Sequence, residues 1–111
     1  MIYSLKQQQL LFDLRHYRDL KEELKATEEN LCLCLAGSET YAAFSAQQTD
    51  LLARISEVER RVLKLPEQKR RVLVGRFFEG KTWFDVSQDV GYSVDHCSGK
   101  LLRRAFQCFL Q

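Results

Sequence analysis

The first third of the chain repeats hydrophobic residues at intervals of seven. This seam consists of Leu10, Tyr17, Leu24 and Leu31, and charged residues fill most of the positions between them. In an α-helix, heptad spacing gathers such residues into one narrow apolar stripe. The pattern therefore predicts a single amphipathic helix over about residues 5–35.

Three pairs of opposite charge, each spaced four residues apart, are expected to support this helix. They are Arg15/Asp19, Arg18/Glu22 and Lys25/Glu29. A pair of this kind stabilises an isolated helix by about 0.2–0.5 kcal/mol. The charged side of the helix is accordingly interpreted as facing solvent.

A loop is expected after this helix, followed by a second seam. Gly37 can end the first helix in a left-handed conformation, and Ser38 or Thr40 can cap the next one. The stretch as far as Gln48 fits either a helix or an irregular connection. The second seam has steps of four and three residues and consists of Leu51, Ile55, Val58, Val62 and Leu65.

Pro66 predicts the end of the second seam near Lys64 and Leu65, because a residue that precedes proline disfavours the helical region. Two helices with such seams can bury them on each other, as a hairpin, or on a second copy of the chain, as a homodimer. The spacing alone leaves both arrangements open.

Short helices are expected beyond Pro66. A helix that ends before Gly80 would bury Val72, Leu73, Phe77 and Phe78. The sequence from Thr82 to Asp85 resembles a capping box at the start of the next helix. Gly91 would end that helix, and Ser93 would cap a last helix that runs to about Phe109.

Two short helices joined at Gly91, the second of them basic, match a helix-turn-helix. Ser87 supplies a small residue where the helices cross, and Gly91 tolerates a positive φ. At about 100° per residue, one side of the last helix is apolar and consists of Val94, Cys97, Leu101, Ala105 and Cys108. The other side is polar and includes His96, Gly99, Lys100, Arg103 and Gln107.

This polar side carries the donors that the major groove of DNA accepts. The candidate DNA contacts on the last helix are Ser93, Asp95, His96, Lys100 and Arg103. At the start of the preceding helix, Lys81 and Thr82 are candidate phosphate contacts. The basic run Lys69, Arg70 and Arg71 is a further candidate for contact with phosphate or with a polymerase.

Composition and charge sharpen this division. The chain of 111 residues has five glycines and one proline, which favours helices. Residues 1–61 carry a net charge of −2 and residues 62–111 a net charge of +4. Such asymmetry suggests two roles, so we expect a helical arm or dimerisation element over residues 1–64 and a helix-turn-helix DNA-binding domain over residues 65–111.

The second of these segments resembles region 4 of sigma-70-type factors. The matching residues are Leu65-Pro66, Arg71-Val72-Leu73, Arg76 to Thr82, Val86-Ser87, Val90 to Ser93 and Arg104-Ala105-Phe106. The closer resemblance is to phage and prophage sigma-like regulators of the RinA and ArpU type, which carry a long N-terminal helix before such a domain. The sequence departs from the family pattern at Ser87, His96, Cys97 and Gly99.

The resemblance implies an all-α fold, a last helix that binds promoter double-stranded DNA, and contact with bacterial RNA polymerase. Its implied role is the regulation of phage or prophage transcription. An alternative from another class is a helical adaptor that binds RNA polymerase or a phage protein without using DNA. A DNA-binding protein would lose affinity steeply as salt rises, whereas an adaptor would show no affinity for duplex DNA.

Other classes of function have little support in the sequence. Cys32, Cys34, Cys97 and Cys108 lack the paired spacing of a zinc site, and no catalytic grouping is visible. We therefore expect no enzyme activity, no metal and no cofactor. Five aromatic residues could stack on single-stranded nucleic acid, but most of them are interpreted as core: Phe77, Phe78, Trp83, Phe84 and Tyr92. Cys32 and Cys34 are interpreted as apolar filler.

The sequence also bears on the compartment. It contains no apolar run of the roughly 18 residues that a membrane span needs, and its first residues do not resemble a signal peptide. We therefore expect a cytoplasmic protein whose cysteines are free thiols, and the resemblance implies that the cytoplasm is that of a bacterial host.

Overall fold

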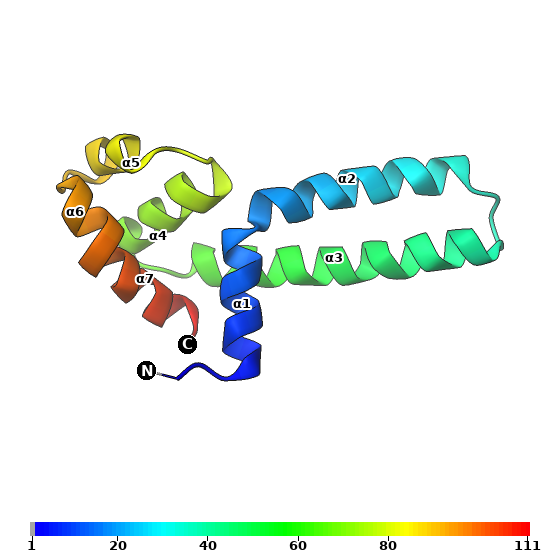
Figure 1. Cartoon of the computed structure of the whole chain (residues 1–111), viewed down its shortest axis with the longest axis horizontal. Helices are drawn as coiled ribbons and strands as arrows, with labels where there is room; N and C mark the ends of the chain where they lie inside the picture. Colours follow the sequence, from blue (N-terminus) through cyan, green and yellow to red (C-terminus); the bar gives the residue numbers. More distant parts are fainter. Residues whose placement is uncertain (1) are drawn as a thin grey trace.

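The computed structural model describes residues 2–111, which are helical with no strand. Figure 1 shows a long hairpin of two helices, α2 and α3, that projects from a group of shorter helices, with α1 lying across the base of the hairpin. The molecule is elongated, with extents of 53 × 29 × 19 Å. The prediction of an all-α protein with a helical arm and a C-terminal helical region is confirmed.

The prediction of one helix over residues 5–35 is wrong, because the segment bends at His16. Helix α1 covers Leu5–Arg15 and helix α2 covers Tyr17–Leu33. The backbone N–H of His16 still donates to the carbonyl of Phe12 at 3.0 Å, but the residue itself has φ −108° and ψ 21°. The bend allows α1 to lie across α3 while α2 runs along it (Figure 1).

The three charge pairs expected along this segment are absent from the ion pairs of residues 2–111. The guanidinium of Arg15 instead lies over the ring of Phe106, 5.3 Å from its centroid. The arm is tied together by another pair, in which Arg54 Nη2 lies 2.8 Å from Oδ1 of the buried Asp13.

Helix α3 covers Glu39–Leu63 and includes the stretch that the sequence left ambiguous. It begins at Ser38, whose hydroxyl accepts a hydrogen bond of 3.0 Å from the backbone N–H of Tyr41. The preceding Gly37 has φ 85°, as the loop requires. The helix ends before Pro66, as predicted.

The two seams are buried on each other within one chain, because α2 and α3 lie side by side (Figure 1). The buried seam residues are Leu10, Tyr17 and Leu24 on one side and Leu51, Ile55, Val58, Val62 and Leu65 on the other. Burial fades toward the far end of the hairpin, where Leu31 is half-buried and Leu33 is exposed.

The next helices are short. Helix α4 covers Glu67–Leu73 and continues into η1, Val74–Phe78, which is a wide turn of π-helix. In this turn the N–H of Glu79 donates to the carbonyl of Val74, five residues back, at 2.9 Å. Helix α5 follows and covers Trp83–Val90.

The last helix, named here for its whole length of residues 94–109, is also interrupted by a π-turn. It comprises α6 (Val94–His96), η2 (Cys97–Leu101) and α7 (Leu102–Phe109). The N–H of Leu102 donates to the carbonyl of Cys97, five residues back. A π-turn inserts one extra residue into the helical repeat, so the face that follows it is rotated.

This rotation corrects the predicted apolar side of the last helix. Cys97 and Leu101, at the two ends of the π-turn, and Ala105, four residues later, are buried as expected. Further along, the buried positions are Phe106 and Phe109, whereas the predicted Cys108 is half-buried. Val94, at the start of the predicted apolar side, is exposed over 38% of its surface.

Two groups of buried residues hold these elements together. The larger joins the arm to the end of the last helix and includes Leu14, Leu73 and the fully buried Phe109. The smaller lies beneath α5 and the last helix and consists of Val72, Val86, Cys97 and Leu101, with Trp83, Val90 and Leu102 packed against it. The C-terminal helices therefore rest on the base of the arm.

Candidate nucleic-acid interface

The turn between α5 and the last helix has the backbone geometry that the sequence predicts. Gly91 has φ 81° and ψ 18°, in the left-handed region, and its N–H donates to the carbonyl of Ser87 at 2.9 Å. Ser87 is buried, and its hydroxyl donates to the carbonyl of Phe84 at 2.6 Å. A small side chain at this position allows the two helices to cross closely.

The start of the last helix is capped by Ser93, whose hydroxyl oxygen accepts from the N–H of His96 at 3.2 Å. The ring of His96 is half-buried and packs at a tilt on the ring of Tyr92, with 4.6 Å between centroids. Asp95 is exposed in the first turn. Of the three candidates at this end, Ser93 and His96 thus have local structural roles, and Asp95 makes no polar contact within residues 2–111.

Lys100 and Arg103 lie three residues apart on the last helix, and both are exposed. Neither forms an ion pair within residues 2–111. The neighbouring Gly99 borders open space, since a Cβ built there meets no atom within 4 Å. This side of the helix therefore combines unpaired positive charge with room for a ligand to approach the backbone.

The two candidates before α5 are in different environments. Thr82 caps α5, and its hydroxyl accepts from the N–H of Asp85 at 3.2 Å, which is one half of the predicted capping box. Lys81 Nζ lies 2.8 Å from a carboxylate oxygen of Asp89 and 3.3 Å from one of Glu79. Hydrogen bonds to these carboxylates raise the pKa of Lys81, and they neutralise the charge that a phosphate contact would use.

The basic run on α4 is not one patch. Lys69 Nζ lies 3.3 Å from Cys108 Sγ. Arg71 pairs with Glu67, the Nη2 to Oε1 distance being 2.7 Å. Arg70 is half-buried and forms no ion pair within residues 2–111. Within residues 2–111, Lys69 and Arg70 therefore form no ion pair, whereas the charge of Arg71 is compensated by Glu67.

The aromatic residues divide between core and surface. Phe77 stacks on Phe106 and Phe78 stacks on Tyr17, with centroid distances of 6.0 Å and 4.0 Å. Other aromatic side chains are exposed, as Phe84 is over 62% of its surface and Tyr92 over 42%. The interpretation of most of these residues as core holds for Phe77, Phe78 and Trp83, whereas Phe84 and Tyr92 lie at the surface.

The cysteines do not belong to a cluster of metal ligands in residues 2–111. Across residues 2–111 there is no group of three or more His, Cys, Asp or Glu side chains that could hold a metal ion. Cys32 is exposed, so its interpretation as apolar filler is wrong, whereas Cys97 is buried and burial raises the pKa of its thiol. Over the same residues, no helix is long and apolar enough to cross a membrane.

Two basic residues outside the predicted set lie against the last helix and α5. They are Arg15, over Phe106 of α7, and Arg76, over Trp83 of α5. Sequence reasoning assigned Arg15 to a solvated helix face and gave Arg76 no role beyond the family match. No feature of the sequence predicts the bend at His16, which places Arg15 of α1 over Phe106 of α7.

Comparison with known proteins identifies no relative. No family model matches the chain, and neither a curated protein nor a solved structure does.

Proposed function

We propose that this protein is a DNA-binding transcriptional regulator of the sigma-70 region 4 type that acts on phage or prophage genes in the bacterial cytoplasm. The last helix enters the major groove of promoter DNA, and Lys100 and Arg103 contact base edges or phosphates. One observation carries this proposal. A basic helix follows the left-handed Gly91 turn and presents two exposed cations that have no carboxylate partner within residues 2–111.

The proposal assigns different roles to the other candidate residues. Ser93 and Thr82 cap their helices, so they act by orienting backbone N–H groups toward the DNA backbone. Asp95 and His96 lie at the groove end of the last helix, and Arg70 is available for phosphate or for RNA polymerase. Lys81 would have to leave Asp89 and Glu79 before it could bind phosphate.

Contact with bacterial RNA polymerase is part of the proposal and rests on the family resemblance. Association of two chains through the N-terminal helices is a further part, supported by apolar side chains that the hairpin leaves uncovered. At its far end, Leu33 is 85% exposed and Leu35 is 82% exposed. The same side chains favour the second candidate function, an adaptor that binds RNA polymerase or a phage protein without DNA.

A matched pair of double variants tests the DNA-binding proposal. K100A/R103A should weaken binding to duplex DNA from the region flanking the gene by at least about tenfold at 0.1 M salt, because two phosphate or base contacts are lost. K6A/K25A removes the same charge from exposed positions on the arm and should leave binding within about twofold. Fluorescence anisotropy measures affinity, and circular dichroism checks that helicity is unchanged.

Retention of wild-type affinity in K100A/R103A would show that the last helix does not bind the groove as proposed. Equal losses in both variants would instead indicate binding driven by net charge alone. An adaptor would show no affinity for the duplex and would be captured by its protein partner at every salt concentration.

A further inference from the structure

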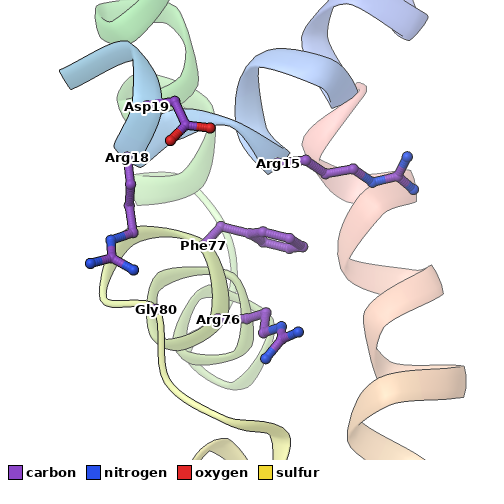
Figure 2. Close-up of a pocket in the computed structure, with 6 residues that line it drawn as sticks. All are labelled: Arg15, Arg18, Asp19, Arg76, Phe77 and Gly80. Atoms are coloured by element: carbon purple, nitrogen blue, oxygen red, sulfur yellow. The ribbon is translucent and has the colours of Figure 1, made fainter. Parts of the chain in front are cut away.

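A second basic site lies where the arm meets the C-terminal helices. It is a pocket of about 360 Å³. Its lining residues are Arg15, Arg18, Asp19, Arg76, Phe77 and Gly80 (Figure 2). Three arginines and one aspartate give this lining a net charge of +2. The arginines come from the end of α1, the start of α2 and the η1 turn, so only the folded chain brings them together.

The charges of these arginines are not compensated by ion pairs within the described residues. Arg15, Arg18 and Arg76 form none of the ion pairs found in residues 2–111. By contrast, most arginines of α3 and α4 form ion pairs, for example Arg54 with Asp13 and Arg71 with Glu67. Unpaired guanidinium groups that surround a concave surface are a binding site for an anion.

Contacts with aromatic rings hold two of these guanidinium groups in place. Arg15 lies 5.3 Å from the centroid of Phe106, and Arg76 lies 4.9 Å from that of Trp83. Arg76 Nη1 also donates to the carbonyl of Lys81 at 3.0 Å. A guanidinium has five N–H donors, so both groups keep donors for a ligand. In Figure 2 their side chains extend toward the same side, with the ring of Phe77 between them.

The third arginine closes the opposite rim. Arg18 points toward Gly80 (Figure 2), and a Cβ at that position would clash with its guanidinium. Gly80 also has φ 68°, which a side chain rarely adopts. The close approach of Arg18 thus depends on glycine at this position.

Two of the lining arginines pack on the two helices that the Gly91 turn joins. Phe106, beneath Arg15, lies three residues beyond Arg103 on the last helix. Trp83, beneath Arg76, is the first residue of α5, next to the cap Thr82. In helix-turn-helix complexes, the first helix crosses the DNA backbone and phosphate contacts flank the helix in the groove. Arg15 and Arg76 are therefore held against the last helix and against α5, respectively.

We infer that this pocket binds a phosphate of the DNA backbone beside the site contacted by the last helix, with Arg15 and Arg76 as its principal donors. The inference rests on the proposed function. Guanidinium forks suit phosphate oxygens because they donate two parallel hydrogen bonds. Such a contact adds affinity and register without sequence preference.

The test measures the salt dependence of duplex binding in three double variants. R15Q/R76Q removes both charges and leaves shorter polar side chains, and R15K/R76K keeps the charges. K6Q/K25Q is the matched control on the arm. We expect R15Q/R76Q to lose on the order of tenfold in affinity at 0.1 M salt for each contact removed, and to reduce the slope of log K against log salt by about one per contact. R15K/R76K and K6Q/K25Q should retain most of the wild-type slope.

A second measurement needs no variant and so does not depend on their folding. The arginine Nε–Hε NMR signals of wild-type Arg15 and Arg76 should shift when duplex DNA is added and should not shift with an acidic peptide of equal charge. Two results would contradict phosphate binding in the pocket and leave the proposed function standing. One is that the NMR signals do not change when DNA is added. The other is that folded R15Q/R76Q keeps the wild-type salt slope while K100A/R103A is impaired. Absence of duplex binding by the wild type would overturn both, and shifts with the peptide alone would indicate a protein partner.

Discussion

The basic residues of α3 and those of the last helix differ in what neutralises them. On α3, Arg54 binds Asp13, and Arg60 and Arg61 both bind Glu57 at 2.7 Å. On the last helix, Lys100 and Arg103 are exposed without an ion pair in residues 2–111. The basic charges of α3 thus stabilise the arm itself, whereas those of the last helix remain available to a ligand.

The two regions nevertheless share one core. Phe109, at the end of the last helix, is fully buried in the group that contains Leu14 and Val58 of the arm. This joint fixes the last helix against the base of the hairpin. It follows that the difference in charge lies between two parts of one folding unit.

The largest expected effect on stability comes from removing the side chain of Phe109 from this shared core. F109A should lower the free energy of unfolding by about 3–5 kcal/mol, because it leaves a cavity at a fully buried site. The control F84A alters a ring that is 62% exposed and should change stability by less than about 0.5 kcal/mol. Urea unfolding is followed by helicity and by the fluorescence of Trp83, the single tryptophan. Loss of the Trp83 signal well before the helicity of the arm would contradict a shared core.

A smaller effect is expected from the charge pair within the arm. R54A leaves the Asp13 carboxylate, whose side chain is 4% exposed, with a hydrogen bond from Gln9 alone. This should cost about 1–3 kcal/mol. The control R60A removes an arginine whose side chain is 51% exposed and should cost between 0 and about 1 kcal/mol. Similar costs in both variants, measured by urea unfolding, would remove the distinction between the buried pair and the surface pair.

The smallest expected effect is a pH dependence at the paired face of α3. Hydrogen bonds from Arg60 and Arg61 lower the pKa of Glu57 from 4.5 to about 2. Because the folded pKa is depressed, this stabilisation is complete above pH 4.5 and is lost as the pH falls toward 2. The Glu57 side chain is 35% exposed, so screening limits the effect to about 1 kcal/mol or less.

E57Q removes the titrating group and is the variant that tests this dependence. Thermal unfolding of the wild type should lose more stability than E57Q between pH 5 and pH 2. Parallel losses in the two proteins would assign the acid sensitivity to other carboxylates.

Much of the fold could be predicted because periodicity and caps are local signals. The seams around Leu24 and Ile55, the cap at Ser93 and the left-handed Gly91 all follow from residue type and spacing. Both π-turns were missed, because no residue type marks them. The one at Cys97–Leu101 displaced the predicted apolar face from Cys108 to Phe109.

The bend at His16 could not be predicted, and this hid part of the candidate site. The heptad from Leu10 to Tyr17 continues across the bend, so spacing alone could not distinguish one helix from two. Only the packing of α1 across α3 brings Arg15 to Phe106. Likewise, sequence could identify Lys81 as a basic residue before a helix but not its neutralisation by Asp89 eight residues later.

The salt dependence of wild-type binding to the DNA that flanks the gene tests the central claim most directly. If Lys100 and Arg103 are free to meet phosphates and bases, affinity should fall steeply between about 50 mM and 200 mM salt, with log K linear in log salt. Absence of duplex binding at both concentrations, or an affinity that does not change with salt, would contradict the account.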